Sequence, residues 1–176
     1  MIRWFKPVVV LTLLALTVPA STAYAQRDAG AKLRGEYGFY GGGAGTALRS
    51  ARESSATYQQ YGKSTQAVNP QVARDAADAI GTYITKAQAH FAYMRKQAQT
   101  ASDKDTLTAL DSIDKHLAAA AKSHAEMKET CLKDHVEGAP VMECCKHIDD
   151  HLAAAIAEHD KLMKKLAGGN APKSQK

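Results

Sequence analysis

Residues 114–120 read DKHLAAA, and residues 149–155 read DDHLAAA. A further histidine follows each copy at the same offset, His124 after the first and His159 after the second. Apolar residues around both copies recur every three or four positions, which is the period of an amphipathic helix. The two copies therefore predict two similar helices joined by a short turn, and we interpret them as the products of an internal duplication.

Helix-starting and helix-breaking residues mark out three long helices. Asn69-Pro70 combines a capping residue with proline at the first helical position, and Ser102 or Asp103 can cap a second helix. Gly138 separates that helix from the last one. Short turns between long helices favour antiparallel neighbours. We therefore predict an all-α, antiparallel up-down bundle of three long helices, to which a weaker pattern over residues 46–62 adds a short N-terminal fourth helix.

The beginning of the chain has the pattern of a secretory signal peptide. Residues 1–25 contain two basic residues, a short apolar run and small residues before Gln26. The apolar run is shorter than the roughly 20 residues that span a bilayer. We expect cleavage after Ala25, which makes the protein exported, periplasmic or secreted, with no membrane span in the mature chain.

The remaining boundaries follow from composition. Glycine is dense over residues 26–45, with three glycines in succession at 41–43. Because glycine weakens regular structure, the sequence predicts a flexible segment there. The helical bundle is then expected over residues 46–167, followed by a disordered polar tail over residues 168–176.

Charge and motifs exclude several classes of protein. The 176-residue chain carries 23 basic and 18 acidic residues, a net charge of +5, and loss of Arg3 and Lys6 with the signal lowers it to +3. Nucleic-acid binding requires a strong basic stripe, so we expect no nucleic-acid partner. The signatures of covalent haem, zinc proteases, serine hydrolases and phosphate loops are absent, so we predict no enzymatic activity.

All three cysteines and six of the seven histidines lie between residues 116 and 159. If the last two helices form a hairpin at Gly138, residues equally far from the turn face each other. This geometry pairs thiols with thiols and imidazoles with imidazoles: Cys131 with Cys144, His124 with His151, and His116 with His159.

These side chains are the donors that copper(I) and zinc prefer, and helical bundles commonly build metal sites from facing helices. The sequence therefore predicts a copper or zinc site used for storage, buffering or delivery outside the cytoplasm. The predicted ligands are His124, Cys131, His135, Cys144, Cys145 and His151.

A second interpretation uses the same cysteines differently. An exported protein can form disulfides, and Cys131 is placed to pair with Cys144 or Cys145. In that case the bundle holds no metal and is a structural or interaction module that binds a protein partner or the cell envelope. The sequence leaves both interpretations, and the oligomeric state, open.

Overall fold

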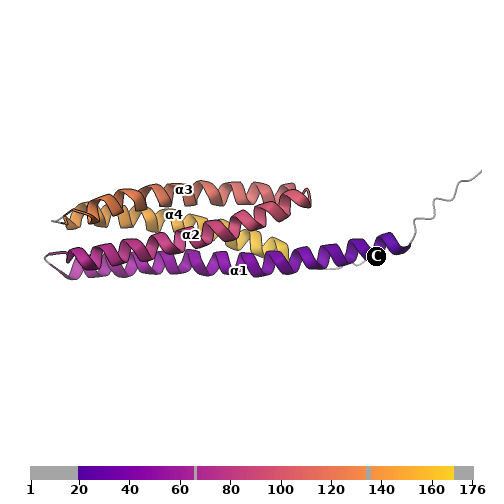
Figure 1. Ribbon diagram of the computed structural model, residues 1–176, viewed down its shortest axis with the longest axis horizontal. Coiled ribbons are helices and arrows are strands. Elements are labelled where there is room, and N and C mark those ends of the chain that lie inside the picture. The colour runs from indigo at the N-terminus through magenta and orange to yellow at the C-terminus, as the bar shows by residue number, and fades with distance from the viewer. Residues whose placement is uncertain (1–19, 66, 134–135, 169–176) are drawn as a thin grey trace, which may run out of the picture.

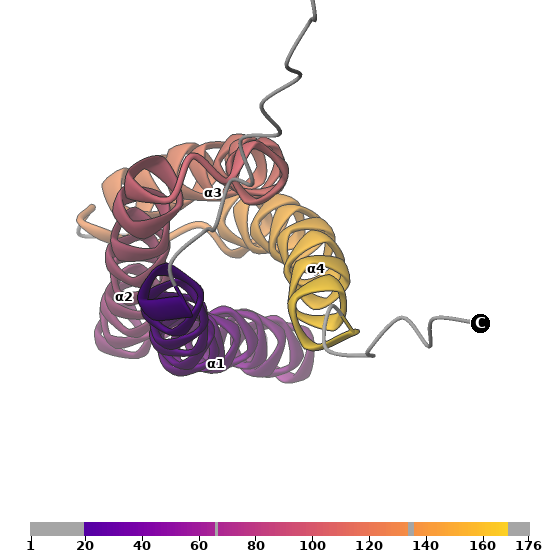
Figure 2. The same ribbon diagram turned by 90° about the vertical axis from the view of Figure 1, so that its right-hand side faces the viewer.

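The computed structural model describes residues 20–65, 67–133 and 136–168, and this part of the chain contains four helices and no strand. The helices are α1 (Ala20–Ser64), α2 (Pro70–Thr100), α3 (Lys104–Cys131) and α4 (Gly138–Gly168). They lie side by side along one long axis (Figure 1). Seen from the end, they form a ring in which α1 and α3 each pack against both α2 and α4 (Figure 2).

The structure describes only part of the predicted signal peptide and only the first residue of the predicted tail. Residues 1–19 of the predicted signal peptide and residues 169–176 of the predicted tail lie outside the described residues. Within the described ranges, none of the helices has a stretch long and apolar enough to cross a membrane.

Side-chain caps set the beginnings of α2 and α3. The side-chain oxygen of Asn69 accepts hydrogen bonds from the backbone N–H groups of Gln71 and Val72, at 2.8 and 3.4 Å. Asp103 Oδ1 accepts from the N–H of Thr106 at 3.0 Å. These caps satisfy N–H groups that have no partner within the helix. They confirm the start predicted at Asn69, and of the two predicted caps Ser102 and Asp103 the structure uses Asp103.

Helix α1 is the main difference from the sequence prediction. The expected flexible segment over residues 26–45 and the expected short helix over residues 46–62 belong to one helix of 45 residues. Glycine costs roughly 1 kcal/mol per position in a helix interior. That cost is offset by tertiary packing, because Tyr37 and Ala44 are buried in the common core.

The glycines of α1 also let side chains of α4 approach its backbone closely. Met163 lies against Gly41, and a Cβ atom on Gly45 would come within 2.5 Å of the His159 ring. Further along, Met142 lies against Gly62. The glycines that weaken α1 in isolation create the holes that the neighbouring helix fills.

This packing predicts opposite effects for two alanine substitutions in α1. Gly45→Ala is expected to lower the free energy of unfolding by about 1–3 kcal/mol, because the new methyl group overlaps the buried ring of His159. A Cβ atom at position 42 has no other atom within 4 Å. Gly42→Ala is therefore expected to raise the free energy of unfolding by up to about 1 kcal/mol. Urea denaturation of both variants measures the two signs. Equal stabilisation by both would contradict the close contact between Gly45 and His159.

Candidate metal centre

His124 does not face α4. Its Nε2 lies 2.8 Å from the backbone carbonyl oxygen of Ala77 in α2, and its ring lies against Gly81. His151 instead neighbours His116, with ring centroids 6.4 Å apart. The predicted pairing of His124 with His151 is therefore wrong. The His124 ring packs against Gly81 of α2 and not against α4.

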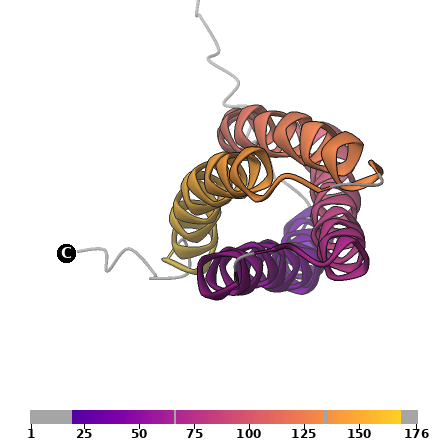
Figure 3. The same ribbon diagram turned by 90° about the vertical axis from the view of Figure 1, so that its left-hand side faces the viewer.

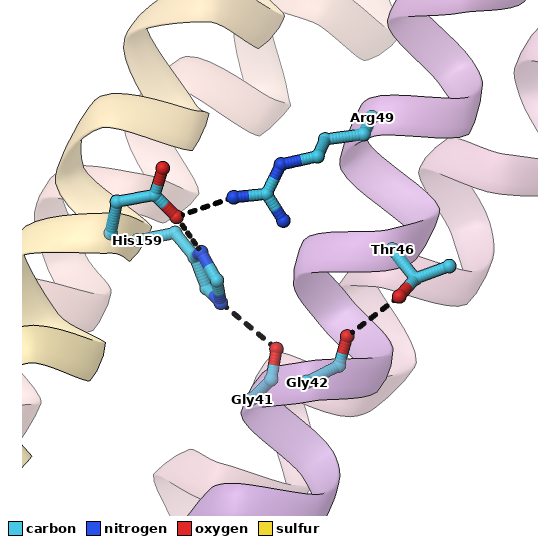
Figure 4. Close-up of polar contacts among 6 residues, drawn as sticks. Gly41, Gly42, Thr46, Arg49 and His159 are labelled. Carbon is cyan, nitrogen blue, oxygen red and sulfur yellow. Dashed lines mark hydrogen bonds and ion pairs between the residues drawn. The ribbon is translucent and has the colours of Figure 1, made fainter. Parts of the chain in front are cut away.

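His159 is likewise used to join two helices. Its side chain is buried, and Nε2 donates a hydrogen bond to the carbonyl oxygen of Gly41 at 2.9 Å. Nδ1 lies 2.9 Å from a carboxylate oxygen of Asp160, which also accepts from Arg49 at 2.7 Å. Figure 4 shows the ring pointing from α4 toward Gly41, with Thr46 bonded to the next carbonyl along α1, at 3.0 Å. His159 thus contacts α1, and its predicted pairing with His116 is wrong.

The two histidines of the sequence repeat make the same kind of contact. His159 covers Gly45 and bonds the carbonyl four residues earlier, at Gly41. His124 covers Gly81 and bonds the carbonyl four residues earlier, at Ala77. Because glycine has no Cβ atom, an imidazole ring can approach the helix backbone there and reach a carbonyl oxygen that a larger side chain would cover. The repeat in the sequence therefore corresponds to a repeated helix–helix contact.

The cysteines gather where α3 ends and α4 begins, at the end of the bundle that faces the viewer in Figure 3. Cys131 and Cys145 are 1% and 0% exposed, Cys144 is half-buried, and all three are free thiols. The Cys145 thiol donates to the Met127 sulfur at 3.7 Å. Met127 and Cys131 are four residues apart on α3 and so lie one turn apart on one face. A thiol and a thioether are therefore in contact in the core, and the second buried thiol lies one helical turn away from the thioether.

The other two helices also reach this sulfur cluster, which we define as Met127, Cys131 and Cys145. From α1, the hydroxyl of Ser55 donates to the backbone carbonyl of Cys145 at 3.0 Å. One turn further along α1, Tyr58 is 3% exposed, and its hydroxyl has no hydrogen-bond partner among the described residues. From α2, Arg74 Nε donates to the carbonyl of Cys131 at 3.1 Å.

Burial controls the protonation of the cluster. It raises the pKa of the Cys145 thiol to about 12; a hydrogen bond from Ser55 opposes the shift, and the neighbouring Cys144 and Cys131 add to it. The pKa of Cys131 is also raised, by burial first and then by Cys144, while the nearby charge of Arg74 lowers it. Burial raises the pKa of Tyr58 above its ordinary range, and Cys131 and Cys145 raise it further. At neutral pH both buried thiols are therefore uncharged.

The predicted ligand set is only partly assembled. The cysteines converge, whereas His124 and His151 lie elsewhere and His135 falls outside the described residues. Among the side chains that the structure describes, no group of three or more His, Cys, Asp or Glu residues is arranged to hold a metal ion. The sulfur that contacts the Cys145 thiol belongs to Met127, a residue type outside that set.

The predicted ligand set did not include Met127, and sequence reasoning did not place Tyr58 or Arg74 at the site. A signal existed for the first, because Met127 precedes Cys131 by one helical turn. The sequence evidence for Tyr58 was weaker. The residue belongs to the apolar pattern over residues 46–62, and nothing in the sequence shows that this helix packs beside the cysteines. No sequence feature connects Arg74 to Cys131, which is 57 residues away.

The comparisons with known proteins add no relative from which a function could be transferred. No protein-family model matches the chain, and no curated protein or solved structure matches it.

Proposed function

We propose that the protein is an exported helical bundle that binds a soft or borderline metal ion, copper(I) or zinc, for storage, buffering or delivery and catalyses no reaction. The observation that carries this proposal is the contact of the buried free thiol of Cys145 with the sulfur of Met127 at 3.7 Å, one helical turn from the buried free thiol of Cys131. Sulfur donors brought together in a low-dielectric core form a ligand set that suits soft metal ions. The cysteines of the last hairpin, rather than its histidines, supply the ligands.

The proposal includes an antiparallel up-down order of the four helices. Contacts between α1 and α4, such as Gly45 with His159 and Gly62 with Met142, support opposite directions for that pair. Between α2 and α3, Lys128 meets Asp78 at 3.1 Å and Arg95 meets Asp114 at 2.7 Å, which supports the same relation. In this order both Cys131 and Cys145 lie at one end of the bundle.

Export rests on the composition of residues 1–25. An oxidising compartment converts accessible thiols into disulfides, and a bound metal ion would protect the sulfurs of the cluster as burial does. Export and metal binding are therefore compatible in one protein.

The test uses the protein produced with its own residues 1–25 in an exporting bacterium and purified anaerobically. Mass spectrometry gives the new N-terminus, and a thiol assay in denaturant counts the free cysteines. Copper(I) and zinc are then titrated against competing chelators. We expect a chain beginning at Gln26, three free thiols, and metal binding tighter than micromolar that is abolished in Cys131→Ser but kept in His124→Ala. Two oxidised thiols, together with no binding tighter than micromolar, would overturn the metal-binding proposal.

A second candidate function, a structural or protein-interaction bundle, is favoured by one surface feature. The ring of Phe39 is 73% exposed and lies edge-on against Tyr40, at 5.1 Å between centroids. Tyr40 in turn stacks on Tyr93 of α2 at 3.7 Å. Exposed aromatic side chains are common anchors in protein interfaces. A Cys131 disulfide with Cys144 or Cys145 in the purified protein, and no bound metal, is the result that this function expects.

A further inference from the structure

We propose that the site is specific for copper(I) over zinc, with Cys131, Cys145 and Met127 as ligands and the Tyr58 hydroxyl as a hydrogen-bond donor to the metal-bound sulfur. This inference rests on the proposed function and deepens it, because it names the ion, the ligands and a residue that supports them. Each of the four groups is buried at the same end of the bundle.

The donor set distinguishes the two ions. Zinc prefers four nitrogen, oxygen or thiolate ligands in a tetrahedron, and the cluster provides only two of these, the thiols of Cys131 and Cys145. The imidazole of His124 is bonded to a carbonyl of α2. Thioether sulfur, by contrast, is a soft donor that selects copper(I). Met127 lies 3.7 Å from the Cys145 sulfur and thus completes a three-sulfur set that zinc cannot use well.

Charge explains why Tyr58 belongs to the site. Copper(I) binding forms two copper–thiolate bonds and one copper–thioether bond, and the two thiols release two protons to solvent. Copper keeps its oxidation state, so the two thiolates and the Cu⁺ ion leave one net negative charge in the core. A buried charge is costly unless hydrogen bonds or an opposite charge compensate for it.

The surroundings of the cluster supply both kinds of compensation. The Tyr58 hydroxyl is a buried donor without a partner among the described residues. The Cys131 and Cys145 sulfurs are near enough for their charge to act on it, and metal binding would make these sulfurs thiolate acceptors. Arg74 contributes a positive charge next to Cys131, where its Nε already bonds the backbone carbonyl. Without the metal the Tyr58 hydroxyl has no acceptor within the described part of the chain, whereas a metal-bound thiolate would provide one.

The experiment compares three variants with the full protein. Met127→Leu removes the thioether, Tyr58→Phe removes only the hydroxyl, and Met94→Leu is the matched control, since Met94 is equally buried and lies in α2 away from the cysteines. Copper(I) and zinc affinities are measured by chelator competition, and the stability of each metal-free variant by urea denaturation.

We expect copper(I) affinity to fall by about 10–100-fold in Met127→Leu and about tenfold in Tyr58→Phe, changes of the size seen when groups around a metal site are removed. Met94→Leu should bind as the wild type does. Tyr58→Phe should leave the metal-free protein as stable as before or more stable, which separates a role in binding from a role in folding. In the wild type, an excess of zinc should not displace copper(I).

The outcomes separate this inference from the proposed function. If the wild type binds neither ion, the proposed function itself fails. If it binds copper(I) through Cys131 and Cys145, but Met127→Leu and Tyr58→Phe bind as tightly as Met94→Leu, only the inference is overturned. Zinc binding tighter than copper(I) binding would also overturn the inference and leave the proposed function standing.

Discussion

Copper(I) affinity is expected to fall by about a hundredfold for each unit by which the pH is lowered, since two thiols must release their protons before the metal can bind. Burial raises the pKa of Cys145 to about 12 and also raises that of Cys131. Both thiols therefore remain protonated throughout the neutral range, and protons compete with the metal at every pH in it. Copper(I) affinity therefore rises with pH, because the thiols lose their protons more readily at higher pH.

Chelator competition between about pH 6 and pH 8, corrected for protonation of the chelator, measures this slope. Among the described residues of the other two helices, Tyr58 of α1 and Arg74 of α2 act on the cluster thiols, and Glu126 of α3 acts on Cys144. None of these three side chains is an imidazole. A site that used only histidine would lose its pH dependence above about pH 7, where imidazole is already neutral. An affinity that levels off there, or that does not change with pH, would contradict the thiol site.

The two adjacent cysteines of α4 are expected to differ strongly in their importance. Cys145→Ser should lower copper(I) affinity by at least about a hundredfold, more than the effect of changing a group outside the metal's own ligands. The Cys145 sulfur is fully buried and contacts Met127, whereas Cys144 is half-buried at the edge of the bundle. Cys144→Ser should change the affinity by less than about threefold, because a residue outside the ligand set affects the site only indirectly.

Chelator competition with both variants, alongside a urea denaturation of each metal-free protein, measures the difference. Serine in place of Cys145 puts a hydroxyl in the core, so Cys145→Ala serves as a second variant that removes the sulfur without adding a polar group. Equal losses in Cys144→Ser and Cys145→Ser, or a larger loss in Cys144→Ser, would show that the ligand set has been assigned to the wrong cysteine.

Some parts of the fold could be predicted from the sequence because their determinants are local. The caps at Asn69 and Asp103 act on N–H groups two or three residues away, and both starts were predicted. The apolar stripe of α4, from Val141 through Leu152 to Leu162, is buried as its spacing indicates. In these elements the residues that set the structure are neighbours in the chain.

Helix α1 could not be predicted in the same way, since the partners of its glycines are distant. His159, which lies against Gly45 and bonds the carbonyl of Gly41, is 118 residues away from Gly41. Local propensity counts glycine only as a helix breaker. The packing that reverses this effect appears only when α4 is placed beside α1.

The candidate site also has parts that the sequence predicts and parts that depend on distant helices. The turn predicted near Gly138 placed Cys131 and Cys145 close to each other, and in the structure they lie near the end of α3 and near the beginning of α4. The position of His124 on its helix suggested a ligand, but its acceptor, the carbonyl of Ala77, lies on α2. The contribution of Tyr58 depends on α1, a helix that the sequence pattern did not connect to the cysteines.

X-ray absorption at the copper edge of the copper(I)-loaded protein tests the central claim most directly, because it identifies the atoms bound to the metal. Three sulfur donors and no imidazole are expected, with one sulfur lost in Met127→Leu and the spectrum unchanged in His124→Ala. Nitrogen donors with the outer-shell scattering of imidazole rings, altered in His124→Ala, would contradict a site built from the sulfur atoms of Met127, Cys131 and Cys145.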